Sequence, residues 1–312
     1  MKNIIIDTDP GIDDALALLL AFRSPELKIE AITTVSGNVS QEKANLNALK
    51  LLEFMGVKNV PVARGAEKPL LREPMYAEEF HGVSGLGDAT LPEPKLKSDK
   101  RSAVQLLFDK IEELDGKLTI VAIGPLTNIA SALLLNAKKV EKIDELVIMG
   151  GAFQLTPYGY GNATPVAEFN IWHDPLAAKI VFDSRLRIKA VGLDVTTDPK
   201  NRLTKRVFNN LLKANNARTR LISSLCQRLV EKFDGMSLHD PMAIAVAVDE
   251  NLAETSKFRV EVETQSELTI GQTIVDKRKY SKPSEENINV EICTSIDGEK
   301  FLKMFMERII VE

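Results

Sequence analysis

A chain of 312 residues is long enough to bury a sizeable hydrophobic core, as one large domain or two small ones. Its composition, with 44% hydrophobic and 27% charged residues, is that of an ordinary globular protein. The formal net charge is -4, and Lys and Arg are spread along the whole chain. This balance argues against nucleic acid or an anionic membrane as the main partner.

The cysteines and the N-terminus point to the cell interior. Cys226 and Cys293 lie far apart and match no zinc-binding spacing. A chain of this size that is stabilised by its core rather than by disulfides is typical of a reducing compartment. The apolar run from Ile4 to Ile6 is too short for a signal peptide or a membrane span. We therefore expect a cytoplasmic protein without a membrane partner.

Short apolar runs alternate with longer amphipathic stretches along the first two thirds of the chain. The pattern predicts strands at residues 4–6, 29–35, 60–63, 118–123, 145–149 and 188–193. It predicts helices at residues 15–22, 41–55, 102–114, 128–135 and 175–182. Further along, it predicts a long helical region at 202–233, a β-meander at 258–294 and a closing helix at 298–310.

This alternation predicts an α/β fold with an open, mostly parallel sheet and helices on both faces. Continuous apolar runs are typical of strands that are buried on both sides. The segment 69–94, rich in Pro, Gly and Glu, interrupts the pattern as a long excursion. No repeat, low-complexity tract or linker divides the chain. We expect a single domain over residues 1–312, with a small β insertion near the C-terminus.

The first predicted strand is followed directly by four aspartates, at positions 7, 9, 13 and 14. Parallel sheets place ligands at the carboxyl ends of their strands. Four crowded carboxylates repel one another unless a cation or protonation compensates. Hard oxygen ligands favour Ca²⁺ or Mg²⁺ over zinc. The alternative is structural, because aspartates also cap helices and stabilise helix N-termini.

A second enzyme class fits this opening. Phosphatases of the haloacid dehalogenase type also begin with an apolar strand and an Asp-x-Asp pair, which Asp7 and Asp9 satisfy. Asp7 would then be a nucleophile that forms an aspartyl phosphate in a Mg²⁺-dependent reaction. The opening motif alone leaves both interpretations open.

Three segments that are distant in sequence from this motif contain further candidate functional residues. The run 161–170 offers Asn162, Glu168 and Asn170, which suit a polyhydroxylated ring because each hydroxyl both donates and accepts. His239 and Asp240, at a predicted helix start, combine a proton donor with a metal-ligating or orienting carboxylate. His81 lies among glycines inside the excursion and indicates a mobile loop over a substrate.

Other candidate functional residues have weaker signals in the sequence. The backbone carbonyl of Ile123 follows a strand and precedes a Gly-Pro turn, where it can ligate calcium. His173, beside Asp174 at another helix start, is expected to be structural. Trp172 could stack on a base, but a core position is the expected one. Polar loops with Asx turns remain the alternative for the 161–170 run.

Together, these motifs resemble the inosine-uridine-preferring nucleoside hydrolase family. The family's Asp-x-Asp-Pro-Gly-x-Asp-Asp-Ala motif is at 7–15, and its Gly-Asn-Ala-x-x-x-Ala-Glu-Phe-Asn run is at 161–170. Its Met-Gly-Gly turn is at 149–151 and its His-Asp-Pro at 239–241. The matches span most of the chain in the family's order, and they weigh against the phosphatase interpretation.

The resemblance implies a Rossmann-like α/β domain that hydrolyses the N-glycosidic bond of ribonucleosides, pyrimidine nucleosides or inosine, to ribose and free base. It implies a Ca²⁺ ion held by Asp9, Asp14, the Ile123 carbonyl and Asp240. It implies a substrate-binding set of Asp13, Asn38, Met149, Asn162, Glu168, Phe169 and Asn170. His239 would face the base, which places the chain in the His-bearing class of the family rather than in the tryptophan-stacking class.

The same resemblance suggests catalytic roles. Asp9 would be the general base for water, His239 the acid for the leaving base, and Glu168 and Asp13 would stabilise a ribosyl cation with oxocarbenium character. His81 corresponds to a loop histidine of many relatives, although Ser84 stands where that loop usually has an acidic residue. Residues 227–233 are expected near the base. Members of the family are usually homodimers or homotetramers.

Two other function classes make different predictions. A phosphohydrolase would release phosphate, whereas a nucleoside hydrolase releases reducing ribose and free base. A calcium- or nucleoside-binding protein on the same scaffold would bind ribose without releasing a base. The motifs do not indicate which base is preferred, because loop positions shape the base pocket.

Overall fold

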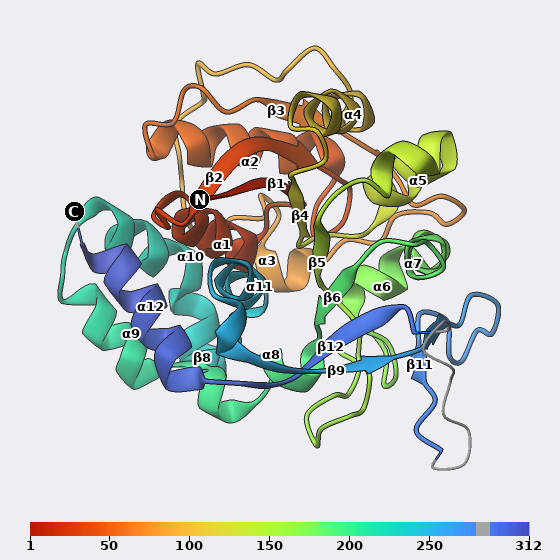
Figure 1. The fold of residues 1–312 in the computed structure, drawn as a ribbon. Coiled ribbons are helices and arrows are strands. Elements are labelled where there is room, and N and C mark those ends of the chain that lie inside the picture. Colours follow the sequence, from red (N-terminus) through yellow and green to blue (C-terminus); the bar gives the residue numbers. More distant parts are fainter. Residues whose placement is uncertain (279–287, 312) are drawn as a thin grey trace.

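The computed structural model describes residues 1–278 and 288–311. Its centre is an eight-stranded sheet in which every neighbouring pair is parallel except β12 and β9, which are antiparallel (Figure 1). In sheet order the strands are β3 (Val62–Arg64), β2 (Leu27–Thr34), β1 (Lys2–Thr8), β4 (Thr119–Ala122), β5 (Glu145–Met149), β6 (Ile188–Val191), β12 (Val290–Ile296) and β9 (Ala253–Phe258).

Alternate side chains of β1 enter two separate cores, one on each face of the sheet. Ile4 and Ile6 belong to one core and Ile5 to the other, as the two-residue period of a strand requires. The first face is covered by α1 (Ile12–Phe22), α2 (Gln41–Phe54), α10 (Ala217–Phe233), α11 (His239–Val248) and α12 (Gly298–Ile310). The second is covered by α4 (Ala103–Glu113), α5 (Thr127–Val140) and α7 (Pro175–Phe182).

The remaining elements are short and lie in the connections. The helices are α3 (Glu78–His81), α6 (Phe169–His173), α8 (Leu193–Thr196) and α9 (Lys205–Leu212), with 3-10 turns η1 (Pro199–Asn201) and η2 (Glu250–Leu252). Two small antiparallel sheets pair β7 (Leu203–Thr204) with β8 (Gly235–Met236), and β10 (Val260–Val262) with β11 (Thr273–Val275).

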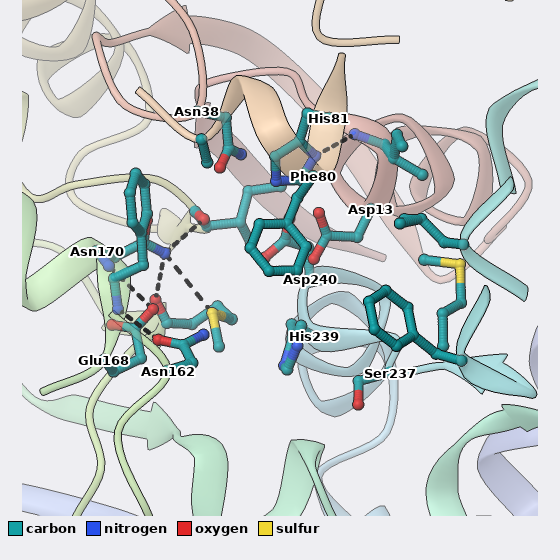
Figure 2. A pocket seen from close by; sticks show the side chains of 18 of the residues that line it. Asp13, Asn38, Phe80, His81, Asn162, Glu168, Asn170, Ser237, His239 and Asp240 are labelled. Carbon is teal, nitrogen blue, oxygen red and sulfur yellow. Dashed lines mark hydrogen bonds between the residues drawn. The ribbon is translucent and has the colours of Figure 1, made fainter. Parts of the chain in front are cut away.

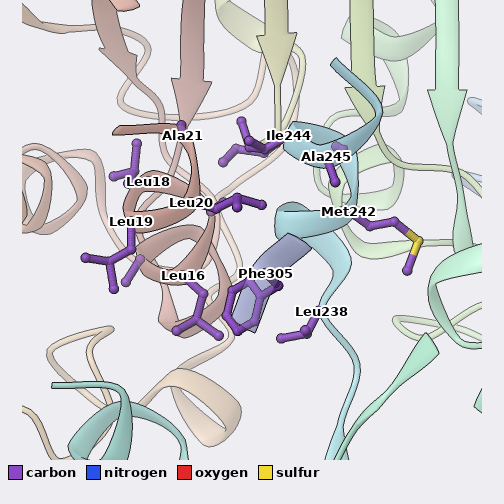
Figure 3. Packing of buried hydrophobic residues seen from close by; sticks show 14 of the residues in the cluster. Leu16, Leu18, Leu19, Leu20, Ala21, Leu238, Met242, Ile244, Ala245 and Phe305 are labelled. Atoms are coloured by element: carbon purple, nitrogen blue, oxygen red, sulfur yellow. The ribbon is translucent and has the colours of Figure 1, made fainter. Parts of the chain in front are cut away.

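Helices α1 and α11 form the centre of the first core. Every residue of α1 from Ile12 to Ala21 is buried, and so is α11 from Asp240 to Ala247. Figure 3 shows leucines of α1 beside Met242 and Ile244 of α11, with Phe305 of α12 next to them. Because both helices begin at the carboxyl edge of the sheet, this packing fixes the start of α11 beside the turn after β1.

The fold class and most elements agree with the sequence-based predictions. The parallel sheet with helices on both faces is confirmed, and the predicted bounds of β5, α7 and α12 match the structure residue for residue. Helix α1 begins at Ile12 rather than at Ala15, because the Asp14 carboxylate accepts the Gly11 N–H (2.9 Å) and closes the first turn. No helix among the described residues is long and apolar enough to cross a membrane.

Two predictions for the C-terminal half were wrong. The helical region at 202–233 is interrupted: it begins with strand β7, α9 ends at Leu212, and Asn215 has a φ of +45° before Asn216 caps the start of α10. The predicted meander at 258–294 is divided between two sheets. β10 and β11 form a separate hairpin, whereas β12 joins the main sheet beside β6. Residues 279–287 of that prediction lie outside the described residues.

Candidate active site

The site lies where β1, β4 and β5 end at the carboxyl edge of the sheet. Asp9 follows β1, Ile123 follows β4, and Met149 is the last residue of β5. Since neighbouring parallel strands end at the same edge, three segments that are distant in sequence meet there. The start of α11 brings His239 and Asp240 to the same place.

The turn after β1 is held together by the carboxylate of Asp14. Its Oδ1 accepts hydrogen bonds from the Thr8 hydroxyl (2.6 Å) and the Asp9 N–H (3.3 Å). Its Oδ2 accepts from the Gly11 N–H (2.9 Å) and the Asn38 side-chain amide (3.0 Å). The carboxylate is therefore fixed by four donors at the N-terminus of α1, where the helix dipole also favours a negative charge.

Asp9 is buried beside this turn with one oxygen left unpaired. Its Oδ2 accepts the Asn38 N–H (2.5 Å), whereas its Oδ1 has no hydrogen-bond partner among the described residues. A Cβ on Gly124 would lie 2.5 Å from Oδ1, so only glycine leaves room for this oxygen. Burial and the negative charges of Asp14 and Asp13 raise the pKa of Asp9 well above its usual value.

Three carboxylates converge from two helices. One oxygen each of Asp13, Asp14 and Asp240 lies within 4.8 Å of the others. Burial raises the pKa of Asp13 to about 6, with a further contribution from the charge of Asp14. Burial, followed by the charges of Asp13, Asp14 and Asp9, raises the pKa of Asp240 well above its usual value. The protein thus concentrates negative charge that a bound cation would neutralise, and this arrangement can hold a metal ion.

Glu168 and Asn170 form the opposite wall. Glu168 caps α6, and its carboxylate accepts the backbone N–H groups of Asn170 (2.9 Å), Ile171 (3.1 Å) and Gly151 (3.2 Å). Burial raises the pKa of Glu168 to about 7, although these three hydrogen bonds lower it. The Asn170 amide donates to the carbonyls of Ile123 (3.0 Å) and Met149 (3.1 Å). Asn162 accepts the Phe169 N–H (2.9 Å) and joins this wall.

His239 faces the same cavity from the start of α11. Its Nδ1 lies 2.8 Å from the Thr196 hydroxyl oxygen. A hydroxyl can donate to the neutral ring or accept from the protonated ring, so this contact fits both states and turns Nε2 away from Thr196. Burial lowers the pKa of His239, and the nearby charge of Asp13 opposes that shift.

His81 joins the long excursion to the start of α1. The Ile12 N–H donates to His81 Nδ1 (3.0 Å), which places the ring hydrogen of the neutral form on Nε2. Burial lowers the pKa of His81 to about 4. A Cβ on Gly11 would lie 2.5 Å from Nδ1, so glycine at this position allows the ring to approach.

These groups enclose a cavity of about 340 Å³. Figure 2 shows Asn162, Glu168 and Asn170 on one side and His239 and Ser237 on the other, with Asp13 and Asp240 above His239 in this view. Eleven of the predicted residues line the cavity: Asp13, Asn38, His81, Ile123, Met149, Asn162, Glu168, Phe169, Asn170, His239 and Asp240. Asp9 and Asp14 are fully buried, outside the lining.

The cavity lining is divided between polar and apolar groups. The carboxylates and amides suit hydroxyl groups and positive charge. The apolar side chains include Phe80, Leu229, Phe233 and Met236, the last two from the segment that leads to His239, and they suit the faces of a flat ring. A ligand with a polyhydroxylated end and an aromatic end fits this division.

Comparison with known proteins agrees with this division. The model of the inosine-uridine preferring nucleoside hydrolase family matches residues 4–303. The chain belongs to this family. It is therefore an enzyme that hydrolyses the N-glycosidic bond of ribonucleosides.

Relatives and solved structures of this nucleoside hydrolase support the assignment along its whole length. It is 42% identical to uridine nucleosidase 1 of Arabidopsis thaliana, over 88% of this chain and 82% of that protein. It is 38% identical to the inosine-uridine preferring nucleoside hydrolase of Crithidia fasciculata, over 99% of this chain and 97% of that protein. A plant nucleoside hydrolase structure superimposes with a TM-score of 0.91 at 33% identity, covering 100% of this chain and 99% of that one. The structure of the purine-preferring ribonucleoside hydrolase from Gardnerella vaginalis superimposes with a TM-score of 0.89 at 31% identity. It covers 99% of this chain and 98% of that one.

The phosphohydrolase interpretation finds no support in this nucleoside hydrolase. Asp7, its required nucleophile, is fully buried outside the cavity lining. Its Oδ1 accepts from the Thr33 hydroxyl and from the Asn128 amide (2.7 Å). Burial raises the pKa of Asp7 to about 7. A protonated or half-protonated carboxyl that is held between two donors beneath the site is a poor nucleophile.

Sequence reasoning missed part of the base side of the cavity. Leu229 and Phe233 fall in the expected range 227–233, but Phe80, Arg202, Met236 and Ser237 were not anticipated. Phe80 and Ser237 could have been found as close sequence neighbours of His81 and His239. Arg202 has no local signal, because only the pairing of β7 with β8 brings it to the site.

The structural expectation for His173 and Asp174 agrees with the contacts, whereas the expected core position of Trp172 was wrong. His173 is buried, and its Nδ1–H donates to the Met75 carbonyl (3.1 Å), whereas Asp174 caps α7 by accepting the Ala177 N–H (3.0 Å). Trp172 is half-buried under the Arg72 guanidinium, 4.7 Å from the ring centroid, and does not line the cavity.

Proposed function

We propose that this nucleoside hydrolase is calcium-dependent and that Asp9, Asp14, Asp240 and the Ile123 carbonyl hold the ion. The unpaired, buried Oδ1 of Asp9 supports this proposal, because such an oxygen is costly unless it has a partner. The convergence of carboxylate oxygens of Asp14, Asp240 and the neighbouring Asp13 within 4.8 Å also supports a cation at this place, since ligands that are about 2.4 Å from one ion lie up to about 5 Å apart.

The donor set favours calcium among common cations. All of the donors are carboxylate or carbonyl oxygens, whereas zinc prefers nitrogen and sulfur. Calcium accepts six to eight oxygen ligands, and ribose hydroxyls can complete such a shell. When bound, the ion orients substrate hydroxyls and water and offsets the negative charge of the aspartates.

The ribose is held at the polar side of the cavity. Asp13 and Asn38 lie on one wall, and Asn162, Glu168 and Asn170 on the other, with Met149 and Phe169 beside them. Ionised carboxylates accept from ribose hydroxyls, and the Asn amides both donate and accept. The negative charges of Glu168 and Asp13 stabilise the ring as it acquires oxocarbenium character.

Asp9 acts as the general base. Its Oδ1, which has no hydrogen-bond partner among the described residues, accepts a proton from the water that attacks C1′. The bond between C1′ and the base nitrogen breaks, and its electron pair leaves with the base. His239 donates a proton to that base, and Thr196 orients its ring.

His81 closes the cavity over the substrate. Its Nδ1 is occupied by the Ile12 N–H, so Nε2–H remains to donate toward the base. The hydrogen bond to the start of α1 couples the position of the excursion to the turn that carries Asp13 and Asp14.

The observation that carries this proposal is the cavity, with its polar and apolar lining, above buried aspartates. Its test is a panel of uridine, cytidine, inosine and adenosine, assayed for reducing ribose with and without a calcium chelator. We expect ribose release that the chelator abolishes and added Ca²⁺ restores. Full activity after complete removal of divalent cations would contradict the calcium proposal, although not the hydrolase assignment.

Three properties of the whole molecule are also proposals. We infer that residues 1–312 act as one catalytic domain, that the protein is cytoplasmic, and that it forms homodimers or homotetramers. The two cysteines are buried and free, which is consistent with a reducing compartment. Light scattering of the purified protein and localisation of a tagged copy would test the assembly and the compartment.

A further inference from the structure

Arg202 is the single arginine or lysine among the described residues that line the cavity. It lies between η1 and β7, and β7 pairs with β8, the strand that directly precedes Ser237 and His239 in the chain. Its Nη2 donates to the carbonyls of Gly235 (2.9 Å) and Phe233 (3.2 Å). Within residues 1–278 and 288–311, its Nε and Nη1 have no hydrogen-bond partner, although a guanidinium offers five donors.

The small β7–β8 sheet fixes this guanidinium in place. Leu203 pairs with Met236 and Thr204 with Gly235, so the residue before β7 is held against the segment that leads to His239. Gly235 has φ of +132°, and a Cβ there would lie 2.7 Å from the Leu203 carbonyl. Glycine therefore permits the close approach on which the position of Arg202 depends.

The cavity consequently has a charge gradient that matches the reaction. Asp13, Glu168 and Asp240 face the ring that becomes positive, whereas Arg202 lies at the end where the base becomes negative. The electron pair of the broken C1′–N bond goes to the base and is delocalised onto a carbonyl oxygen where one is conjugated with that nitrogen. A fixed cationic donor near that oxygen stabilises the departing base more than the bound substrate.

We propose that Arg202 is a specificity-determining residue: it donates to a carbonyl oxygen of the base, and the preference for oxo-bases, such as uracil and hypoxanthine, over adenine depends on it. The proposal rests on the proposed function, which places ribose at the carboxylates and the base near His239. Adenine has an amino group where hypoxanthine has a carbonyl, so two donors would face each other.

The experiment compares Arg202→Gln with the wild type on four nucleosides. Uridine, cytidine and inosine carry a conjugated carbonyl, whereas adenosine has none in the leaving ring. Losing a hydrogen bond from a charged donor lowers kcat/KM by roughly 10- to 100-fold. We expect that loss for uridine, cytidine and inosine, and a change of less than about threefold for adenosine, which is the reference.

Two further variants separate recognition from folding. Arg202→Lys keeps the positive charge but loses the planar fork, so it should fall between the wild type and Arg202→Gln. Arg206→Gln removes an exposed arginine on α9, outside the cavity lining, and should change no substrate. If Arg202→Gln does not fold, Arg202→Lys and the wild-type preference for inosine over adenosine still test whether Arg202 recognises a base carbonyl.

An equal loss for all four substrates would show that Arg202 only supports the fold, and would overturn the proposal. So would a loss below about threefold for uridine and inosine, or a wild type that hydrolyses adenosine as fast as inosine. Because these outcomes are ratios between substrates, they do not depend on which ion or general base the enzyme uses. Failure of the calcium proposal appears instead as activity that survives chelation.

Discussion

The two sides of the active site are built differently. On the ribose side, buried carboxylates and amides are fixed by backbone donors, as Glu168 is by three N–H groups. On the base side, the wall is largely apolar, and Phe80 and Phe233 keep 54% and 45% of their surface exposed. The ribose is common to all nucleosides whereas the base varies. A rigid site therefore meets the constant part of the substrate, and a more open one meets the variable part.

The largest expected effect is on the rigid side. Asp9→Asn should lower kcat by about 10³- to 10⁴-fold, because the amide cannot accept a proton from water. The matched control is Asp7→Asn, which changes a buried aspartate two residues away whose carboxylate accepts from Thr33 and Asn128 and lies outside the proposed ligand set. It should retain kcat within about threefold. Steady-state ribose release from uridine measures both variants, and near-normal turnover by Asp9→Asn would show that another group is the base.

His239→Ala should produce the next largest loss of turnover. We expect this loss only for substrates with poor leaving groups. Uridine turnover should fall about 100-fold, whereas p-nitrophenyl riboside, whose leaving group departs as a stable anion, should change by less than about threefold. Absorbance assays of both substrates make this comparison. Equal loss for the two substrates would mean that His239 shapes the cavity instead of donating a proton.

Thr196→Val removes the hydrogen-bond partner of His239 and leaves its ring intact. We expect kcat for uridine to fall about tenfold, since the ring loses one hydrogen bond that orients it. Thr196→Ser keeps the hydroxyl and should restore most of the activity. A serine variant as impaired as the valine variant would indicate that the methyl group, and not the hydroxyl, is what matters.

Phe80→Ala tests the open side, where a smaller effect is expected. Truncation removes apolar surface above the base, so KM should rise about 3- to 10-fold with little change in kcat. Leu71→Ala is the control, because Leu71 lies on the same excursion, is 82% exposed and is outside the cavity lining. A drop in kcat without a change in KM would instead assign Phe80 to the chemical step.

The smallest expected effect concerns how the excursion is attached. His173 donates from Nδ1 to the Met75 carbonyl, its Nε2 is buried without a partner among the described residues, and burial lowers its pKa from 6.5 to about 4. The unfolded chain therefore takes up a proton below about pH 6.5 that the folded chain refuses. This contribution to stability is lost as the pH falls from about 6.5 to about 4.

His173→Gln removes this dependence and serves as the reference. Between pH 7.5 and pH 5, the wild type should lose about 2 kcal/mol of unfolding free energy relative to the variant. Urea titrations at the two pH values measure it. The comparison of the wild type with the variant is needed because buried carboxyls with a raised pKa, such as Asp7 and Glu168, change the unfolding free energy with pH in the opposite direction. A difference that does not change with pH would place the His173 ring in solvent.

The same contrast explains how far the sequence could predict the site. Part of the ribose side comes from short motifs at the ends of strands, so strand order alone brings Asp9, Ile123 and Met149 together. The base side depends on strand pairings that leave no local pattern in the sequence, such as that of β7 with β8. The position of Arg202 could therefore not be predicted. The strands of the main sheet up to β6 were predicted from apolar runs. β12 was assigned to a meander because its short alternating pattern fits either sheet.

The most direct test of the account is a calcium titration of the metal-free enzyme by calorimetry. We predict one Ca²⁺ bound per chain, and a loss of affinity of at least about 100-fold in Asp240→Asn, because a charged ligand becomes a neutral one. Asp7→Asn should bind as the wild type does. A wild type that binds no calcium yet releases ribose at its full rate would contradict the central claim that the buried aspartates hold this ion.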